Sequence, residues 1–330
     1  MLMLLGGCAE WPYYRQAVEG QLDLLARRRP VAEMLEDGQT PPALRARLEL
    51  ADRLRRFAVE ELGLTHGDSF RDYADLGRPY AAWVVYATPE FSLTPRSWCF
   101  PFTGCLAYRG YFRREDAATF AEGLRREGLD VHDADVPAYS TLGWFADPLL
   151  NTYIEWPRAR LAGLMFHELA HERLYLKGDT AFNEAFADAV SRVGVERWLE
   201  RQGDAAALAA YRRDIDRRER FLERVGRTRV RLAELYARVL PAGEMRERKQ
   251  AILQEAAREG REHPWWSKGV NNAKLLAVNL YSGWVPAFLA LLQEQGGELD
   301  WFYQEAEALA ALPAGERYRR LAGLTGCGQP

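Results

Sequence analysis

Residues 161–188 read LAGLMFHELAHERLYLKGDTAFNEAFAD, and this stretch decides the fold expected for the chain. Apolar residues recur through its first half at helical spacing, and Pro157, a residue type that suits a first helical position, precedes them. A second helix is expected from about residue 180 to about residue 202. Residues 156–202 are therefore expected to form two consecutive buried helices.

The first of these helices contains the pentapeptide HExxH, from His167 to His171. Two histidines four residues apart lie on one face of a helix, one turn from each other, so both imidazoles can reach one metal ion. Zinc accepts imidazole nitrogen, and in catalytic sites it takes three protein ligands and keeps a position for water. Glu168 projects from the same turn and can take the proton of that water. The motif predicts a hydrolytic Zn²⁺ site with Glu168 as its catalytic base.

Residues 183–188, NEAFAD, lie near the start of the second helix. A short loop separates this helix from the histidine pair. Glu184 is placed to be the third metal ligand, which completes a set of two histidines and one glutamate. Asp188 follows one turn later and can accept the second N–H of a ligating histidine, which would fix the orientation of that ring. A ligand, a base and an orienting carboxylate are thus all expected in one place.

The pairing of an HExxH helix with a glutamate on the following helix resembles the gluzincin class of metallopeptidases. The pattern NExxxD from Asn183 to Asp188 matches the thermolysin-like form of that second helix. The resemblance implies a zincin-like catalytic domain, with Glu184 as the third zinc ligand and Asp188 as the partner of a ligating histidine.

Four further stretches are similar to a narrower family, a group of proteobacterial proteins, often predicted lipoproteins, that is named for zinc aminopeptidase activity. The four stretches are WCFP at 98–101, YRGYF at 108–112, GWFADPL at 143–149 and VPAF at 285–288. The resemblance implies hydrolysis of peptides at the N-terminus. The sequence lacks the Gly-x-Met-Glu-Asn signature of the large zinc aminopeptidases, so it does not identify a carboxylate that binds the substrate amine.

The whole pattern predicts a predominantly helical α+β protein, with residues 9–330 as a single peptidase domain. Short aromatic and β-branched runs punctuated by Pro and Gly predict a small mixed sheet within residues 76–155, at 83–86, 97–100 and 106–112, interrupted by one helix at about 114–127. Residues 203–262 are expected to form a long helical hairpin. Residues 263–323 are expected to form the C-terminal helices.

The first eight residues, MLMLLGGC, resemble the end of a bacterial lipoprotein signal, in which leucine and small residues precede a cysteine. Cys8 would then become the acylated N-terminus of a periplasmic protein anchored to a membrane. The alternative is an N-terminal segment with a chance cysteine. No apolar run of the sequence approaches the length of a membrane-spanning helix, so membrane contact is expected only through the lipid anchor.

Cys99 and Cys105 bracket a short loop that a disulfide could close. Export would place both cysteines in an oxidising compartment, where such a bridge persists. A cytosolic location would instead leave two buried thiols.

The formal net charge of −3 gives the chain no general attraction for nucleic acid. The charged stretch from Arg212 to Arg231 could be interpreted as a patch for nucleic acid or lipid. Acidic residues are interleaved with its arginines, which favours a solvated helix face instead.

Hydrolysis of a peptide bond also needs a donor that faces the developing oxyanion, and Tyr281 on a downstream helix is the candidate. The alternative for Tyr281 is a packed or interfacial tyrosine. Residues 108–112 could offer a sheet edge along which a peptide substrate pairs, or could form an ordinary interior strand.

These observations predict an exported zinc aminopeptidase that acts on peptides, with His167, His171 and Glu184 as metal ligands. One alternative is an endopeptidase or amidase that uses the same residues in a different cleft. The other is a non-enzymatic envelope lipoprotein in which zinc is structural, although such a protein would not require Glu168.

Overall fold

The protein is described by a computed structural model, which covers residues 7–64, 67–100, 104–138, 146–278, 281–294 and 296–325. Residues 7–10, 281 and 282 are described by their backbone alone. Helices dominate and the strands form three small sheets, which confirms the predicted helix-rich α+β class. Two compact units divide the chain: Met1–Ala26, Arg78–Tyr139 and Arg213–Leu280 form the first, and Arg27–Gly77, Ser140–Arg212 and Tyr281–Pro330 form the second.

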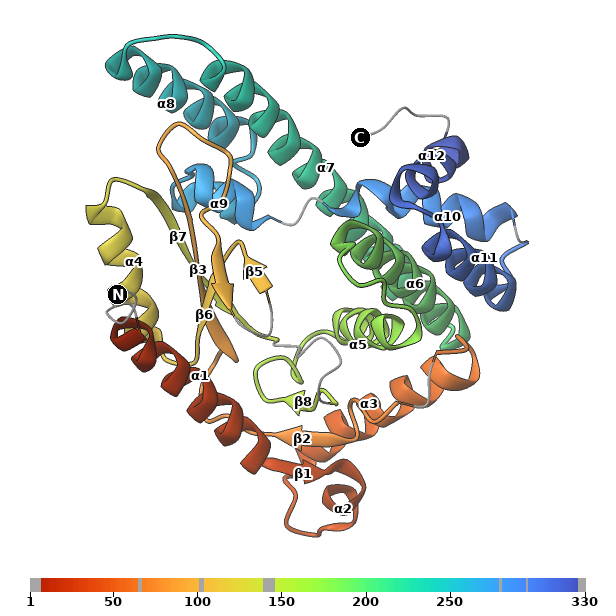
Figure 1. The fold of residues 1–330 in the computed structure, drawn as a ribbon. Coiled ribbons are helices and arrows are strands. Elements are labelled where there is room, and N and C mark those ends of the chain that lie inside the picture. The colour runs from red at the N-terminus through yellow and green to blue at the C-terminus, as the bar shows by residue number, and fades with distance from the viewer. Residues whose placement is uncertain are drawn as a thin grey trace. The chain divides into compact units, whose positions relative to one another are not determined.

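The first unit combines one antiparallel sheet, a two-stranded ribbon and the helical hairpin (Figure 1). Its elements are α1 (Gly7–Ala26), β3 (Ala82–Thr88), β4 (Trp98–Phe100), β5 (Gly104–Leu106), β6 (Arg109–Tyr111), α4 (Arg114–Arg126), β7 (Asp130–Val136), most of α7 (Ala205–Tyr236), α8 (Ala242–Glu259), the 3₁₀ helix η1 (Pro264–Lys268) and α9 (Asn272–Ala277).

The antiparallel sheet has the order β6-β3-β7, with β3 in the centre. Side chains alternate between the faces of a strand, so Trp83, Val85 and Ala87 of β3 share one face and pack against α4 in a hydrophobic cluster. Helix α9 contacts both β3 and β7. The sheet therefore gains its core from the helices that follow its strands in sequence.

Strand β6 lies at the edge of this sheet, and α1 covers it. The side-chain oxygen of Gln16 accepts a 2.9 Å hydrogen bond from the Phe112 backbone N–H, and its amide nitrogen lies 3.5 Å from the Gly110 carbonyl. The helix can approach this closely because Gly20 has no Cβ, which would lie 2.1 Å from the Phe112 ring. Among the described residues β6 is an edge strand and not an interior one, but Gln16 already bonds part of its backbone. Pairing of this edge with a peptide substrate stays a prediction.

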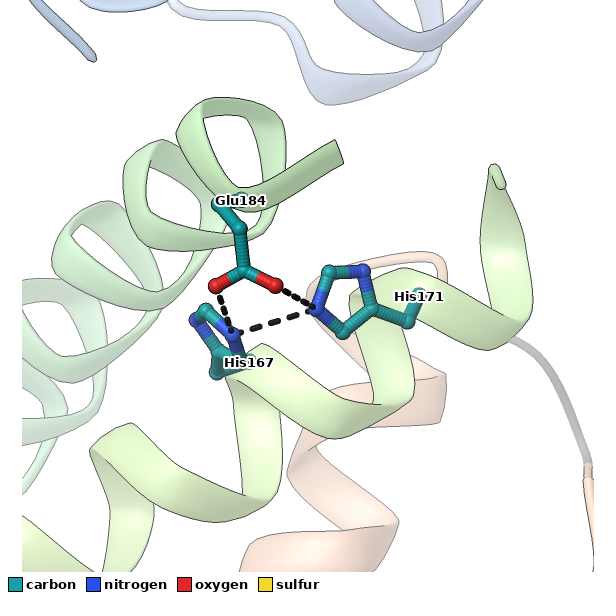
Figure 2. A group of neighbouring side chains, drawn as sticks. All are labelled: His167, His171 and Glu184. Carbon is teal, nitrogen blue, oxygen red and sulfur yellow. Dashed lines mark hydrogen bonds and ion pairs between the residues drawn. The ribbon is translucent and has the colours of Figure 1, made fainter. Parts of the chain in front are cut away.

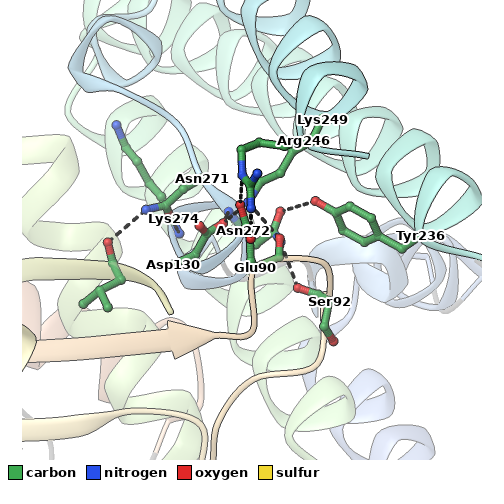
Figure 3. A network of polar contacts seen from close by, with 10 residues as sticks. Glu90, Ser92, Asp130, Tyr236, Arg246, Lys249, Asn271, Asn272 and Lys274 are labelled. Carbon is green, nitrogen blue, oxygen red and sulfur yellow. Dashed lines mark hydrogen bonds and ion pairs between the residues drawn. The ribbon is translucent and has the colours of Figure 1, made fainter. Parts of the chain in front are cut away.

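A buried polar network ties α8 and α9 to the sheet and the loop after β3 (Figure 3). The ammonium group of Lys249 on α8 lies 2.6 Å from the Asp130 carboxylate at the start of β7 and donates to the Glu90 carbonyl at 2.8 Å. Asn272 is fully buried, and its amide donates to the carbonyls of Glu90 and Ser92, both at 3.0 Å. Since Lys249 and Asn272 each satisfy backbone carbonyls, the network replaces water with protein partners at this junction.

The second unit contains a mixed sheet and a group of packed helices (Figure 1). Its elements are β1 (Arg28–Pro30), α2 (Val31–Glu36), α3 (Pro42–Glu60), β2 (Asp72–Ala74), β8 (Leu149–Leu150), α5 (Arg158–Arg173), α6 (Thr180–Arg201), the start of α7, the 3₁₀ helix η2 (Tyr281–Trp284), α10 (Val285–Glu294), α11 (Leu299–Ala311) and α12 (Ala314–Thr325). Helix α5 contacts α3 on one side and α6 on the other, while α6 also contacts α10 and η2.

Three local expectations differ from the structure. The strand predicted at 106–112 is broken, because β5 and β6 belong to different sheets. Pro157 precedes α5 as its N-cap and is not its first helical residue. The one mixed sheet, of order β1-β2-β8, uses two strands that lie outside residues 76–155, and β1 ends in Pro30, which an edge strand tolerates because its N–H need not pair.

Within the described residues, no helix combines the length and the apolar character that crossing a membrane requires.

Candidate metal centre

Helix α5 brings two imidazoles together near its C-terminal end. His167 and His171 are one helical turn apart, and their Nε2 atoms lie 3.1 Å from each other (Figure 2). The two rings are nearly perpendicular, with 4.7 Å between their centroids. Both side chains are largely buried. The two Nε2 atoms, which can each bind a metal ion, therefore face one another with little exposure to solvent.

Helix α6 supplies a carboxylate to the same place. The Glu184 oxygens lie 3.5 Å from His167 Nε2 and 3.7 Å from His171 Nε2 (Figure 2). In the described part of the chain, these three residues form the one group of three potential metal-binding side chains, with ligand atoms within 4.8 Å of one another. The structure thus brings together the three residues that the sequence predicts as ligands.

The spacing of the three ligand atoms suits zinc. Ligands about 2.1 Å from a tetrahedral metal ion lie about 3.4 Å from one another. The two Nε2 atoms are 3.1 Å apart, Glu184 Oε2 lies 3.5 Å from His167 Nε2, and the other oxygen, Oε1, lies 3.7 Å from His171 Nε2, so the separations are close to that value. Two imidazoles and one carboxylate are also the donor set of a common class of catalytic zinc site, which keeps one coordination position open. The donors therefore fit the ion in both chemistry and spacing.

Asp188 orients one of the two histidines. It lies one turn after Glu184 on α6, and its carboxylate oxygen is 3.1 Å from His167 Nδ1. A carboxylate at this distance accepts the Nδ1 proton, which leaves Nε2 as the nitrogen that faces the ligand cluster. His171 differs, because its buried Nδ1 has no hydrogen-bond partner among the described residues.

The two imidazoles have opposite protonation preferences. Burial lowers the pKa of His167, but hydrogen bonds with Asp188 and Glu184 outweigh burial and raise the pKa to about 10. Burial, together with the nearby charge of His167, lowers the pKa of His171 to about 4. His171 is therefore neutral near pH 7, which is the form that binds a metal ion, whereas a metal ion must displace a proton from His167.

Glu168 directly follows His167 in sequence but is not one of the convergent group of candidate ligands. The pKa of its carboxyl group is raised to about 7, mainly by burial and in part by the nearby carboxylates of Asp147, Glu184 and Glu172, against the opposing charge of His167. A buried carboxyl group that exchanges its proton near neutral pH has the property required of a catalytic base.

Asn183 clamps the loop that joins the two ligand helices. Its side chain is buried, accepts from the Leu176 N–H at 2.8 Å and donates to the Leu176 carbonyl at 2.8 Å. Leu176 lies in the loop between α5 and α6. This pair of bonds therefore holds the loop against the start of α6, next to Glu184. The sequence pattern includes Asn183, but the pattern alone gave it no role.

The start of α6 is held by the C-terminal helix α12. Asp179 caps α6 by accepting from the Phe182 N–H at 3.1 Å. The same carboxylate accepts a 2.9 Å hydrogen bond from the Arg317 guanidinium and another from the Tyr318 hydroxyl. Sequence analysis missed both α12 residues, because no local signal connects them to α6.

Small residues let α5 and α6 approach each other closely. The Ser191 hydroxyl of α6 donates to the Gly163 carbonyl of α5 at 2.8 Å. A Cβ on Gly194 would lie 2.7 Å from the Leu62 side chain and 2.8 Å from the Phe166 ring. Because the backbones of α5 and α6 are this close, the histidine side chains of α5 can meet the Glu184 side chain of α6.

The remaining predicted residues lie at the margins of the described structure. Tyr281 begins η2, which contacts α6, but its side chain lies outside the description. Cys8 falls in the first turn of α1 and its side chain is likewise outside it, as are residues 1–6. Cys99 and Cys105 are joined by a disulfide that links β4 to β5.

Comparison with known proteins adds one finding. A family model described as "Putative aminopeptidase" matches residues 12–321, a range that includes parts of both compact units and all the candidate ligands. No curated protein and no solved structure matches the chain.

Proposed function

We propose that this chain, which belongs to the aminopeptidase family whose model matches residues 12–321, is a zinc-dependent aminopeptidase. The observation that carries the proposal is the convergence of His167, His171 and Glu184, with ligand atoms within 4.8 Å of one another. Glu168 lies on α5, the helix that carries both histidines. Family membership supports peptide hydrolysis. The metal and the catalytic glutamate are proposals that rest on this cluster.

The proposed chemistry assigns a separate task to each group. When bound, zinc supplies Lewis-acid polarisation of the scissile carbonyl and makes water more acidic. Glu168 takes a proton from the attacking water onto its carboxylate and returns that proton to the nitrogen of the leaving amine. Asp188 holds the Nδ1 proton of His167, so that Nε2 stays directed at the ligand cluster.

The proposed substrate is a peptide with a free N-terminal amine, and the proposed location is the periplasm, with a lipid anchor at Cys8. The disulfide between Cys99 and Cys105 supports an oxidising compartment, because such bonds persist there and are rare in the cytosol. A zinc endopeptidase or amidase with the same residues remains the second candidate, since the ligand cluster is common to both. A non-enzymatic lipoprotein with structural zinc is the third.

Two substitutions test the metal and the base separately. Glu184→Ala should lose zinc, whereas Glu196→Ala, which removes a carboxylate further along α6 that pairs with Arg212, should keep it. Glu168→Gln should keep zinc and lose nearly all hydrolysis. Metal analysis of purified proteins and turnover of a peptide library measure these outcomes.

Each alternative predicts a different result. A Glu184→Ala protein that still holds one equivalent of zinc would remove Glu184 from the ligand set. A zinc-loaded wild type that hydrolyses no peptide would favour the structural role. Hydrolysis of N-acetylated peptides at the rate of free-amine peptides would favour the endopeptidase or amidase.

A further inference from the structure

Helix α1 has an exposed apolar stripe on the side away from its packed face. The packed face carries Gln16, Gly20 and Leu24, all buried, and the first two of them contact Phe112. On the other side, Trp11, Val18 and Leu22 are 69%, 58% and 59% exposed. We call these three residues the α1 stripe.

The spacing of the stripe places its members on one face of the helix. Val18 follows Trp11 by seven residues and Leu22 follows Val18 by four, which are the intervals of a single helical face. The described residues include eight large hydrophobic side chains that are exposed, and three of them lie on this one helix. Exposed Arg15 lies between Trp11 and Val18 on this face. Exposed apolar residues are ordinary when they are scattered, but several on one helix face mark an interaction site.

The position of the stripe in the chain indicates its partner. It begins three residues after Cys8, and the apolar segment MLMLL precedes that cysteine. The backbone is helical from Gly7, and position 8 precedes Leu22 by two heptads, so it falls in the same helical register as the stripe. At about 1.5 Å per residue, position 8 and Leu22 are about 21 Å apart along the helix axis. A lipid attached at position 8 would therefore bring this face of α1 to a membrane surface.

The polar residues beside the stripe fit a neutral lipid surface. Arg15 pairs with Glu19 at 2.7 Å, and Glu19 also lies 3.4 Å from Arg113, so the exposed charges next to the stripe are already paired. No cluster of basic residues flanks the stripe among the described side chains of α1. Membrane attraction here would come from apolar burial and from the tryptophan, a residue that favours the bilayer interface.

We propose that the α1 stripe is a membrane-contact surface, with α1 lying in the interface of a phospholipid bilayer. The choice of a bilayer as the partner rests on the lipid anchor proposed at Cys8, whereas the contact itself is separate from the proposed catalysis and can be measured without the acyl chain. Helices that bind membranes in this way lie in the plane of the interface with their apolar face buried among the lipid chains. The stripe thus adds a second attachment beside the predicted lipid anchor.

The test uses the full chain with Cys8→Ser, so that acylation cannot contribute, and phosphatidylcholine vesicles in a co-sedimentation assay. The stripe variant Trp11→Ser/Val18→Ser/Leu22→Ser should bind at least tenfold less than the Cys8→Ser parent. The matched control replaces three dispersed residues, Val230, Val239 and Trp301, which are 58%, 102% and 60% exposed, and should bind within twofold of the parent. Raising the salt concentration should leave the binding of the parent unchanged.

Two outcomes would overturn the proposal. One is equal vesicle binding by the parent and the stripe variant, or an equal loss in the matched control. The other is sedimentation of the parent as a dimer without vesicle binding and of the stripe variant as a monomer, which would make a second copy of this chain the partner. Circular dichroism and zinc content, which substitution of exposed side chains should not change, show that the variants are folded.

Discussion

Asn183→Ala should loosen the connection between the two ligand helices and weaken metal binding. The substitution removes two 2.8 Å hydrogen bonds between the Asn183 amide and the backbone of Leu176. A neutral hydrogen bond contributes about 1 kcal/mol net, and a buried group left without a partner costs about 1–3 kcal/mol. Leu176 is only half-buried, so water can reach its freed backbone groups in part. The free energy of unfolding should therefore fall by about 2 kcal/mol.

The same change should lower the affinity for zinc. Loss of the clamp frees the loop between α5 and α6, and the ligands must then be ordered when the metal binds. If ordering the loop costs about 1.4 kcal/mol of the zinc-binding free energy, zinc binds about tenfold more weakly. Urea titration of the metal-free protein measures the stability, and competition with a chromophoric chelator measures the affinity.

A buried asparagine in the other unit provides the control. Asn272 is fully buried and also bonds two backbone carbonyls, those of Glu90 and Ser92. Asn272→Ala should lose comparable stability while zinc affinity stays at the wild-type value. The reasoning is refuted if Asn183→Ala binds zinc as tightly as the wild type, or if both variants lose affinity to the same extent.

Three further predictions follow from single contacts. Asp188→Asn should weaken zinc binding by about 10–100-fold, as removal of a carboxylate that orients a ligating histidine usually does, and chelator competition that gives the wild-type affinity would contradict this. Burial lowers the pKa of His132 to about 4 from a usual value of 6.5, so the unfolded chain takes up this proton first as the pH falls. The free energy of unfolding should consequently decline from about pH 6.5 to about pH 4, and urea titrations at several pH values should show a smaller decline for His132→Gln. Gly194→Ala should cost about 1–3 kcal/mol because its Cβ would lie 2.7 Å from Leu62, whereas Gly123→Ala, where nothing lies within 4 Å of the added Cβ, should be neutral or stabilising in thermal melts.

The two ligand helices were predictable because their signals are local. The HExxH spacing places two imidazoles on one face through helix geometry alone, and the structure has that helix at Arg158–Arg173. The second helix begins at Thr180 in the structure, as expected, because Asp179 supplies the side-chain cap that sequence patterns favour. A loop of only a few residues between them leaves little freedom in how Glu184 can approach the histidines.

Strands were less predictable than helices, for a reason that lies in their length. Strands β1 and β2 have three residues each, too few to show an alternating pattern, and each pairs with residues far along the chain. The break between β5 and β6 depends on which partner each strand finds, since β5 pairs with β4 and β6 pairs with β3. The aromatic residues within 106–112 favour a strand but do not encode the choice of its partner.

Among the contacts that hold the candidate site, those within one helix could be predicted from the sequence and those between distant segments could not. Asp188 was predictable as a histidine partner because it lies one turn from Glu184, so the two side chains share a helix face. Arg317 meets Asp179 across 138 residues of sequence, and nothing near either residue indicates the other. The candidate ligands are thus identified by local spacing, whereas α6, the helix that carries Glu184, is held at its start by the distant helix α12. A change at Arg317 can therefore alter the site without touching a ligand, because it acts on the cap from which α6 begins.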